Sequence, residues 1–329
     1  MMFFKELKPP MSMPSKANRT GKIAIIGCGI LGHNMAIVFT SGGYQVALYD
    51  KDRSQIQKGL IAIQTKLKQY EADGCLRGNL SASDQFQLVQ SYDTLAECVQ
   101  DAIYVQECVT EDLALKKSVF AEADRYVNLD VVMASSTANI FPTVLAENLQ
   151  HKSRVIVAHP LNPPYFVPLI ELVPSKWTDA SAMERARSLF QKLGQAPIVL
   201  KKEIRGFVIC RIQHAITAEC FKMLRDDVIE AEDLDQVMPQ GLGMRYAFIG
   251  QLETNYLNAN GIKDFCERYS KDIYTLQESF GPPIALEGEL IDKVQQQMEK
   301  TIPLDKLEER RKWRDERLSA LAKLKKQLE

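Results

Sequence analysis

The sequence lacks long apolar runs and has almost no net charge, and each shortage excludes a class of protein. No apolar run approaches the ~18–20 residues that a helix needs to span a bilayer, so we expect no membrane-spanning helix. The 41 basic and 42 acidic side chains give a formal net charge of −1. Neither a nucleic acid nor a membrane surface is therefore expected as a partner.

Paired cysteines are also missing. The seven cysteines are an odd number and form no C-x-x-C pair. This pattern argues against a disulfide framework and against a zinc site, so we expect no metal, and it favours reduced thiols. The first twenty residues hold no apolar segment of the kind found in secretory signals. We therefore expect a cytoplasmic protein with a loose N-terminal tail over residues 1–21.

The length and the pattern of apolar residues predict two domains. A chain of 329 residues exceeds what one hydrophobic core usually serves. Short apolar runs alternate with helical spacing up to about residue 203, and long helical stretches follow. This order predicts an α/β fold, with a Rossmann-type doubly wound parallel sheet over residues 22–203. We expect an all-helical C-terminal domain over residues 204–329.

The expected elements can be given as residue ranges. The expected strands are 22–26, 45–49, 102–106, 131–134, 154–158, 167–173 and 197–201. The expected helices are 30–39, 54–70, 112–124, 142–149, 181–193, 207–225, 231–238, 262–278, 287–299 and 304–328. Residues 71–93 are polar and turn-rich, and we assign no element to them.

Residues 27–32 form a G-x-G-x-x-G turn between the first expected strand and the first expected helix. Gly27 permits the tight turn, Gly29 lets the backbone approach a pyrophosphate, and Gly32 lets the helix pack close to the strand. The unpaired N–H groups and the dipole of the helix N-terminus favour phosphate. The turn in this context predicts a dinucleotide site.

An acidic residue at the end of the second strand narrows the choice of cofactor. Asp50 follows Gly32 by eighteen residues, where an acid hydrogen-bonds the adenosine ribose and repels a 2′-phosphate. The nearby Arg53 weakens this preference slightly. Because FAD proteins share the glycine turn, these residues favour NAD over NADP without excluding FAD.

Two further motifs resemble a known family. Val157–Pro164 reads VAHPLNPP and leads to LIELV at Leu169–Val173, similar to the histidine–glutamate region of the 3-hydroxyacyl-CoA dehydrogenase family. The resemblance runs from about Lys22 to the C-terminus and is strongest with a branch that acts on short carboxylates. Its further matches are residues 106–109, 111–113, 241–250, 252–254 and 311–316.

The resemblance implies an NAD-dependent oxidation of a small 3-hydroxy acid, with L-gulonate as a candidate substrate. It also implies a homodimer whose contact lies in the helical C-terminal domain. In the positions of this sequence, the cofactor would be held by Gly27, Gly29, Ile30, Leu31, Gly32, Asp50, Glu111 and Lys116.

His159 is the expected catalytic base, because a neutral imidazole can accept the proton of the C3 hydroxyl near neutral pH. It follows a strand, at the sheet edge where such sites form. Glu171 would accept a hydrogen bond from the other ring nitrogen and stabilise the imidazolium. The remaining histidines lack this context, and we interpret them as structural: His33, His151 and His214.

The sequence departs from the family at two substrate positions. Ala138 stands where the family has a serine, and Cys210 stands where it has an asparagine. Alanine offers no side-chain hydrogen bond and cysteine only a weak one. Loss of one positioned donor typically lowers the rate about 10²–10³-fold. The neighbouring Ser136 belongs to the same expected substrate wall, and Arg245 is either a carboxylate ligand or an interface residue.

Three hypotheses stay open on these residues. The first is an NAD-dependent 3-hydroxyacid dehydrogenase, with activity reduced by the two substitutions. The second is a catalytically inactive NAD-binding protein with a structural or sensing role. The third is the same fold with a different substrate, in which Cys210 acts as a reactive thiol; a buried structural cysteine is the simpler interpretation.

Overall fold

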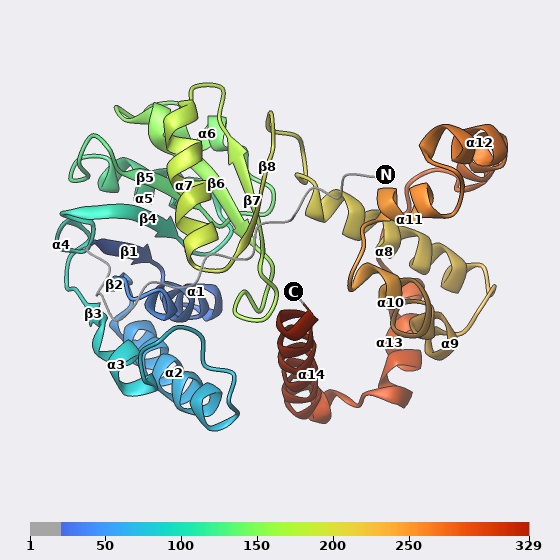
Figure 1. Cartoon of the computed structure of the whole chain (residues 1–329), viewed down its shortest axis with the longest axis horizontal. Helices are drawn as coiled ribbons and strands as arrows, with labels where there is room; N and C mark the ends of the chain where they lie inside the picture. Colours follow the sequence, from blue (N-terminus) through green and yellow to red (C-terminus); the bar gives the residue numbers. More distant parts are fainter. Residues whose placement is uncertain (1–20, 329) are drawn as a thin grey trace, which may run out of the picture. The chain divides into compact units, whose positions relative to one another are not determined.

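The structure is a computed structural model that describes residues 21–328 (Figure 1). Two compact units make up this part of the chain. The first contains the residues up to Val208 together with those from Asp315 onward, and the second contains Ile209–Arg314. The expected N-terminal tail falls almost entirely outside the described residues.

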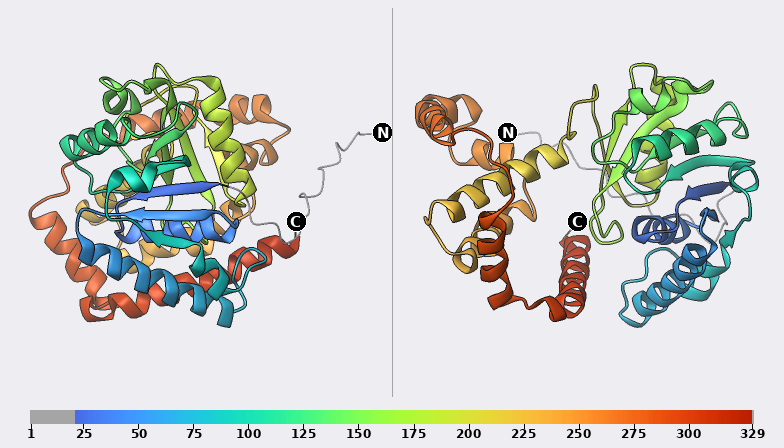
Figure 2. Two further views of the ribbon diagram at one scale, coloured as in Figure 1. Left: turned by 90° about the vertical axis from the view of Figure 1, so that its left-hand side faces the viewer. Right: turned by 180° about the vertical axis from the view of Figure 1, so that it is seen from behind.

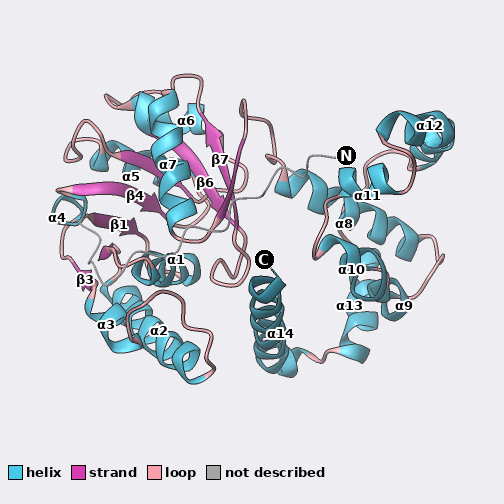
Figure 3. Cartoon of the chain, in the orientation of Figure 1, coloured by secondary structure: helices cyan, strands magenta, loops and turns pink. Residues whose placement is uncertain are grey.

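The first unit is built on an eight-stranded sheet with the order β3-β2-β1-β4-β5-β6-β7-β8 (Figure 3). All seven expected strands are present, within about three residues of the expected bounds. The strands are β1 Lys22–Ile26, β2 Gln45–Tyr49, β3 Val89–Ser91, β4 Ala102–Glu107, β5 Val132–Ser135, β6 Val155–Pro160, β7 Leu169–Pro174 and β8 Ala196–Val199.

The direction of β7 corrects the expectation of a parallel sheet. Strands β1 to β6 pair in parallel, whereas β7 is antiparallel to β6, and β8 is parallel to β7. A parallel connection needs a crossover of about a dozen residues or more. Residues 161–168, which link β6 to β7, are too few, so the chain reverses directly.

Helices cover both faces of this sheet, as expected for a doubly wound fold (Figure 2). In β1, Ile23 and Ile25 face the core shared with α1, α2 and α7, and Ala24 and Ile26 face the core shared with α4, α5 and α6. This alternation follows from the period of two in a strand. The helices are α1 Ile30–Ser41, α2 Arg53–Ala72, α3 Ala82–Gln87, α4 Leu95–Val99, α5 Leu113–Ala123, α6 Pro142–Ala146 and α7 Ala180–Lys192.

Two short α-helices, α3 and α4, and one short strand, β3, lie where no element was expected. The polar segment 71–93 contains α3 and the edge strand β3. Helix α3 has a capping signal, since the Ser81 side chain accepts a hydrogen bond from the Asp84 N–H. With three residues, β3 is too short to show a periodic pattern in the sequence.

The second unit is helical, as expected. The five helices expected here are present, and α10, α11 and a π-helical turn at Met238–Leu242 lie where no element was expected. The helices are α8 Ile209–Arg225, α9 Ala231–Gln236, α10 Gly243–Tyr246, α11 Gln251–Leu257, α12 Ile262–Ser279, α13 Glu289–Thr301 and α14 Leu307–Leu328. The C-terminal part of α14 packs with the first unit, although the sequence assigned it to the second domain. Of the helices in residues 21–328, none is long and apolar enough to cross a membrane.

Candidate active site

The glycine turn between β1 and α1 has the geometry that a dinucleotide requires. Gly27 has φ +101°, and a Cβ there would lie 2.7 Å from the backbone of Cys108. A Cβ on Gly32 would lie 1.9 Å from the carbonyl oxygen of Gly27. A Cβ on Gly29 would meet nothing within 4 Å. The first and third glycines therefore permit internal packing, whereas the second borders open space that a pyrophosphate can enter.

The turn lies at the switch point of the sheet. Strand β1 pairs with β2 on one side and β4 on the other. The chain leaves β1 for α1 on one face and leaves β4 for α5 on the opposite face. This divergence opens a crevice at the carboxyl ends of the strands, which is the usual ligand position in such sheets.

Asp50 lies at the end of β2, where the sequence placed it. Its Oδ2 accepts a hydrogen bond of 2.8 Å from the Cys28 N–H, and its Oδ1 accepts one of 2.9 Å from the Asp52 N–H. Arg53 points to Asp93 in an exposed ion pair of 3.0 Å. The carboxylate thus anchors the glycine turn, and the positive charge of Arg53 is offset by a neighbouring acid.

Lys116 and Glu111 lie beside the crevice in different environments. Lys116 is buried, and its Nζ lies 2.8 Å from Glu107 Oε1 and 3.5 Å from Glu111 Oε2. Burial raises the pKa of Glu107, and the Lys116 ammonium opposes this shift. The Glu111 side chain is 45% exposed, so it can meet a ligand directly, whereas Lys116 acts mainly through its two acids.

The loop after β5 carries the expected substrate wall. Ser136 is buried, and its Oγ accepts a 2.7 Å hydrogen bond from Gln106 Nε2 and lies 3.2 Å from Cys108 Sγ. The Thr137 hydroxyl donates to Glu111 Oε1. Ala138 follows in a bend and is half-buried. The polar side chains of this loop therefore have partners inside the protein, and the family serine position presents only a methyl group.

His159 and Glu171 form a buried pair. His159 Nδ1 lies 2.8 Å from Glu171 Oε2, and the second carboxylate oxygen, Oε1, accepts a 2.7 Å hydrogen bond from the Val208 N–H. Glu171 is fully buried and His159 is 9% exposed. The ring of Phe207 lies 6.3 Å from the imidazole, centroid to centroid. Since the carboxylate accepts the Nδ1 proton, the imidazole keeps a lone pair on Nε2.

The other three histidines lie in different surroundings. Burial, with a smaller effect of Lys66, lowers the pKa of His33 to about 4. His151 Nδ1 lies 2.8 Å from Asp124 Oδ1, which also accepts the backbone N–H of His151. His214 is exposed on α8. His33 and His151 thus have structural surroundings, and His159 is the histidine at the carboxyl edge of the sheet.

Two expected substrate residues lie in the second unit. Cys210 is buried on the first turn of α8. Arg245 is exposed on α10 and lines a cavity of about 510 Å³ beside the π-helical turn. Such turns often occur at functional positions. The remaining residues that line this cavity are Asp233, Gln236, Val237, Gln240, Gly241 and Leu242.

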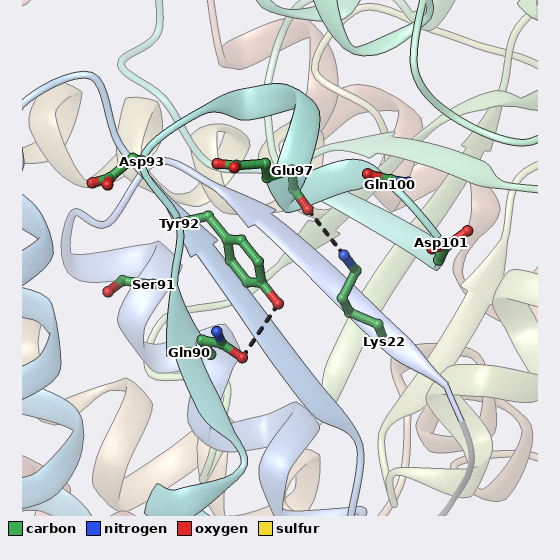
Figure 4. Close-up of a pocket in the computed structure, with 8 residues that line it drawn as sticks. All are labelled: Lys22, Gln90, Ser91, Tyr92, Asp93, Glu97, Gln100 and Asp101. Carbon is green, nitrogen blue, oxygen red and sulfur yellow. Dashed lines mark hydrogen bonds between the residues drawn. The ribbon is translucent and has the colours of Figure 1, made fainter.

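A further cavity of about 610 Å³ contains none of the expected site residues (Figure 4). Lys22 donates to the Glu97 carbonyl there and lies 5.0 Å from the ring centroid of Tyr92. The lysine therefore has partners within the protein. The lining residues are Lys22, Gln90, Ser91, Tyr92, Asp93, Glu97, Gln100 and Asp101.

Two polar groups beside the site were not predicted. Gln106 is fully buried next to the buried Glu107 at the end of β4, and a polar pair at the end of a buried strand was its signal. Asn34 on α1 donates to Asn162 Oδ1 over 3.2 Å and accepts from Lys66 Nζ over 2.6 Å. These bonds connect α1 and α2 to the loop that follows His159.

Comparison with known proteins agrees with this geometry. The family model "3-hydroxyacyl-CoA dehydrogenase, NAD binding domain" matches residues 22–204, and the corresponding C-terminal domain matches residues 206–300. The chain belongs to the 3-hydroxyacyl-CoA dehydrogenase family. It is therefore an NAD-dependent oxidoreductase that acts on a CH–OH group.

Several relatives within this family match most of the chain. Lambda-crystallin of Oryctolagus cuniculus is 44% identical over 94% of this chain and 98% of its own length. L-carnitine dehydrogenase of Oceanobacillus iheyensis is 32% identical over 80% of this chain and 82% of its own. The crystal structure of 5-formyl-3-hydroxy-2-methylpyridine 4-carboxylic acid 5-dehydrogenase, an NAD-dependent dismutase, superposes with a TM-score of 0.73 at 25% identity, covering 93% of this chain and 98% of that one.

Proposed function

We propose that this protein oxidises the C3 hydroxyl of a small 3-hydroxy acid with NAD, and that L-gulonate is the substrate to test first. The observation that supports this most strongly is the buried pair of His159 and Glu171 at the carboxyl edge of the sheet, with an Nδ1–Oε2 distance of 2.8 Å. A histidine with one nitrogen fixed by a carboxylate has the other free for proton transfer.

The proton step follows from this pair. Nδ1–H donates to Glu171, so Nε2 of His159 accepts the proton of the substrate hydroxyl. The imidazolium that forms faces the buried carboxylate, which stabilises its charge. The Val208 N–H holds the second carboxylate oxygen over 2.7 Å, so Glu171 cannot rotate away.

The cofactor is assigned to the crevice beside β1. The open space at Gly29 would admit a pyrophosphate, Asp50 would accept hydrogen bonds from the adenosine ribose, and Glu111 presents a partly exposed carboxylate near the loop that carries Ala138. Bound NAD supplies the acceptor for the hydride that leaves C3. Lys116, buried between Glu107 and Glu111, fixes the latter acid.

The proposed substrate class rests on the relatives and on the guanidinium of Arg245. L-carnitine is a small hydroxy acid, and the dehydrogenase named for it matches most of this chain. Arg245 is exposed at the wall of a cavity, and a guanidinium binds a carboxylate bidentately. We assign Arg245 to the substrate carboxylate, with a role in the dimer contact as the alternative.

The dimer is a further part of the proposal. Several large apolar side chains of the second unit are exposed, and large exposed apolar patches often mark interfaces. Sedimentation of the purified chain tests this point, with twice the chain mass as the expected result. The most exposed are Ile212, Val228, Met244, Phe248, Leu252, Tyr256, Leu257, Tyr274, Leu276 and Leu304.

Ala138 and Cys210 favour a second candidate function. They leave the substrate hydroxyl without the serine and asparagine of the family pattern, while the cofactor crevice is complete. An NAD-binding protein without catalytic activity, serving a structural or sensing role, would have this combination. It would bind NADH tightly and turn over no hydroxy acid.

One experiment separates the two functions. NADH formation is measured with NAD and L-gulonate for the natural chain and for the Ala138→Ser/Cys210→Asn double variant, with His159→Gln as the blank. We expect turnover above the blank in the natural chain. We expect the double variant to be about tenfold or more faster, since one positioned donor typically changes kcat by about 10²–10³-fold. Turnover in the double variant alone supports the second function. No turnover by either, across a panel of small 3-hydroxy acids, refutes the first.

A further inference from the structure

The buried amide of Gln106 connects the carboxyl ends of three strands. Its Nε2 donates to Ser136 Oγ over 2.7 Å and to the Ala158 carbonyl over 3.2 Å. Its Oε1 accepts the Tyr104 hydroxyl over 2.7 Å. Gln106 itself belongs to β4, Ser136 follows β5, and Ala158 precedes His159 in β6. Every polar group of this amide is thus used within the protein.

The orientation of the amide is fixed by chemistry. A carbonyl oxygen can only accept, so the nitrogen of Gln106 must face Ala158. The oxygen of the amide then faces Tyr104, whose hydroxyl must donate. Ser136 accepts from the amide, which leaves its own proton for Cys108 Sγ at 3.2 Å. The network therefore has one consistent arrangement of donors.

The network lies where the sheet opens. Strands β5 and β6 pair as far as Ser135 and Val157, and beyond this point Ala158 and His159 pair with β7 alone. On the side facing β5, the Ala158 carbonyl has no strand partner, and it accepts a hydrogen bond from the Gln106 amide instead. Ala134 is the register partner of Gln106, and its small side chain leaves room for the amide to pass over β5.

We propose that Gln106 is a positioning residue for His159: by holding the Ala158 carbonyl at the opening between β5 and β6, it fixes the backbone from which the imidazole projects. This inference rests on the proposed function, in which His159 is the base. A buried carbonyl that loses its partner is destabilising, so the peptide turns toward another donor. Such a turn moves the ring of His159 relative to Glu171.

The test compares Gln106→Met, which keeps the volume and removes the amide, with the control Tyr104→Phe, which leaves the Ala158 bond intact. The ring ¹H–¹⁵N resonances of the four histidines are recorded with bound NADH, and His159→Gln identifies the signal. We expect one Nδ1–H tautomer of His159 in the natural chain and in Tyr104→Phe. In Gln106→Met we expect shifted resonances or a mixture of tautomers, with the NADH affinity unchanged.

Turnover gives the second readout. We expect kcat of Gln106→Met to fall about tenfold or more, with little change in KM, because a shift of about 1 Å at a reacting group can cost 10²-fold. Unchanged His159 resonances in Gln106→Met, or equal effects of both variants, would overturn the proposal. If Gln106→Met fails to fold, Gln106→Leu, which also lacks the donor, is judged by the same readouts. The histidine resonances can be recorded without turnover. If the natural chain is inactive, the proposed function is refuted, and the resonances still decide whether Gln106 positions His159.

Discussion

His159 and Glu171 are direct partners across the antiparallel strands β6 and β7. Twelve residues separate them in the chain, yet the hairpin register places their side chains on the same face, 2.8 Å apart. A slip of one residue would turn Glu171 to the opposite face of the sheet. The pair therefore depends on the short connection 161–168 as much as on the identity of the two residues.

Replacing Glu171 by glutamine should lower kcat by about 10²–10⁴, because the imidazolium loses its anionic partner and the ring loses its fixed tautomer. The amide nitrogen of glutamine could also come to face the Val208 N–H, which needs an acceptor and not a second donor. Steady-state kinetics and NADH titration provide the measurement. NADH affinity should not change, and the exposed Glu122→Gln on α5 serves as the control. A Glu171→Gln variant with natural kcat would remove the orienting role.

The glycines of the turn should respond differently to alanine. Gly29→Ala adds a methyl group in open space, so we expect an unchanged Tm but at least a tenfold loss of NADH affinity. Gly32→Ala places the methyl 1.9 Å from the Gly27 carbonyl, so we expect a loss of about 1–3 kcal/mol in unfolding free energy. Thermal denaturation and NADH fluorescence distinguish the two effects. Equal NADH affinity in Gly29→Ala and the natural chain would contradict the assigned pyrophosphate position.

Asp50→Asn should shift the cofactor preference toward NADP. The amide keeps an acceptor for the Cys28 N–H but removes the negative charge that repels a 2′-phosphate. A hydrogen bond to a charged acceptor contributes about 1.5–3 kcal/mol and one to a neutral acceptor about 0.5–1.5 kcal/mol, so we expect NADH affinity to fall roughly 5- to 10-fold. Dissociation constants for NADH and NADPH measure this, with Asp52→Asn as the control. An unchanged ratio of the two constants would rule out Asp50 as the selecting residue.

His33 should make the fold sensitive to acid. Its pKa falls from 6.5 to about 4, chiefly through burial and secondarily through Lys66. Because the unfolded chain binds the proton first, the free energy of unfolding declines as the pH falls from about 6.5 to about 4. The contribution is about 2 kcal/mol once the partial exposure of the ring is taken into account. Denaturant unfolding across this range should show a flatter profile for His33→Gln than for the exposed His214→Gln, and parallel profiles would disprove the assignment.

Much of the first unit could be predicted because its determinants are local. Short apolar runs predict strands such as β1, and the spacing of apolar residues predicts the long helices, including α2 and α7. The predicted parallel direction of β7 was wrong, because strand direction depends on the length of the connection and on the neighbouring strand. The short elements α3, α4, α10, α11 and β3 were missed because three to seven residues are too few for a clear periodic signal.

The roles of single side chains were harder to predict. Ser136 and Lys116 lie in motifs that suggest ligand contacts, yet both are buried and bonded to Gln106 and Glu107, respectively. Which face a side chain occupies, and what it meets there, depends on strands that are distant in the chain. Asn34 and Asn162 are 128 residues apart, and no local pattern connects them.

Residue type and spacing alone predict the glycine turn, the acid at position 50, the histidine and the glutamate, and the two unusual residues Ala138 and Cys210. The tertiary structure decided the rest. It set the antiparallel register that brings Glu171 to His159, the opening between β5 and β6, and the buried amide of Gln106 that bridges it. These depend on contacts between distant segments, which form only when the whole sheet has assembled.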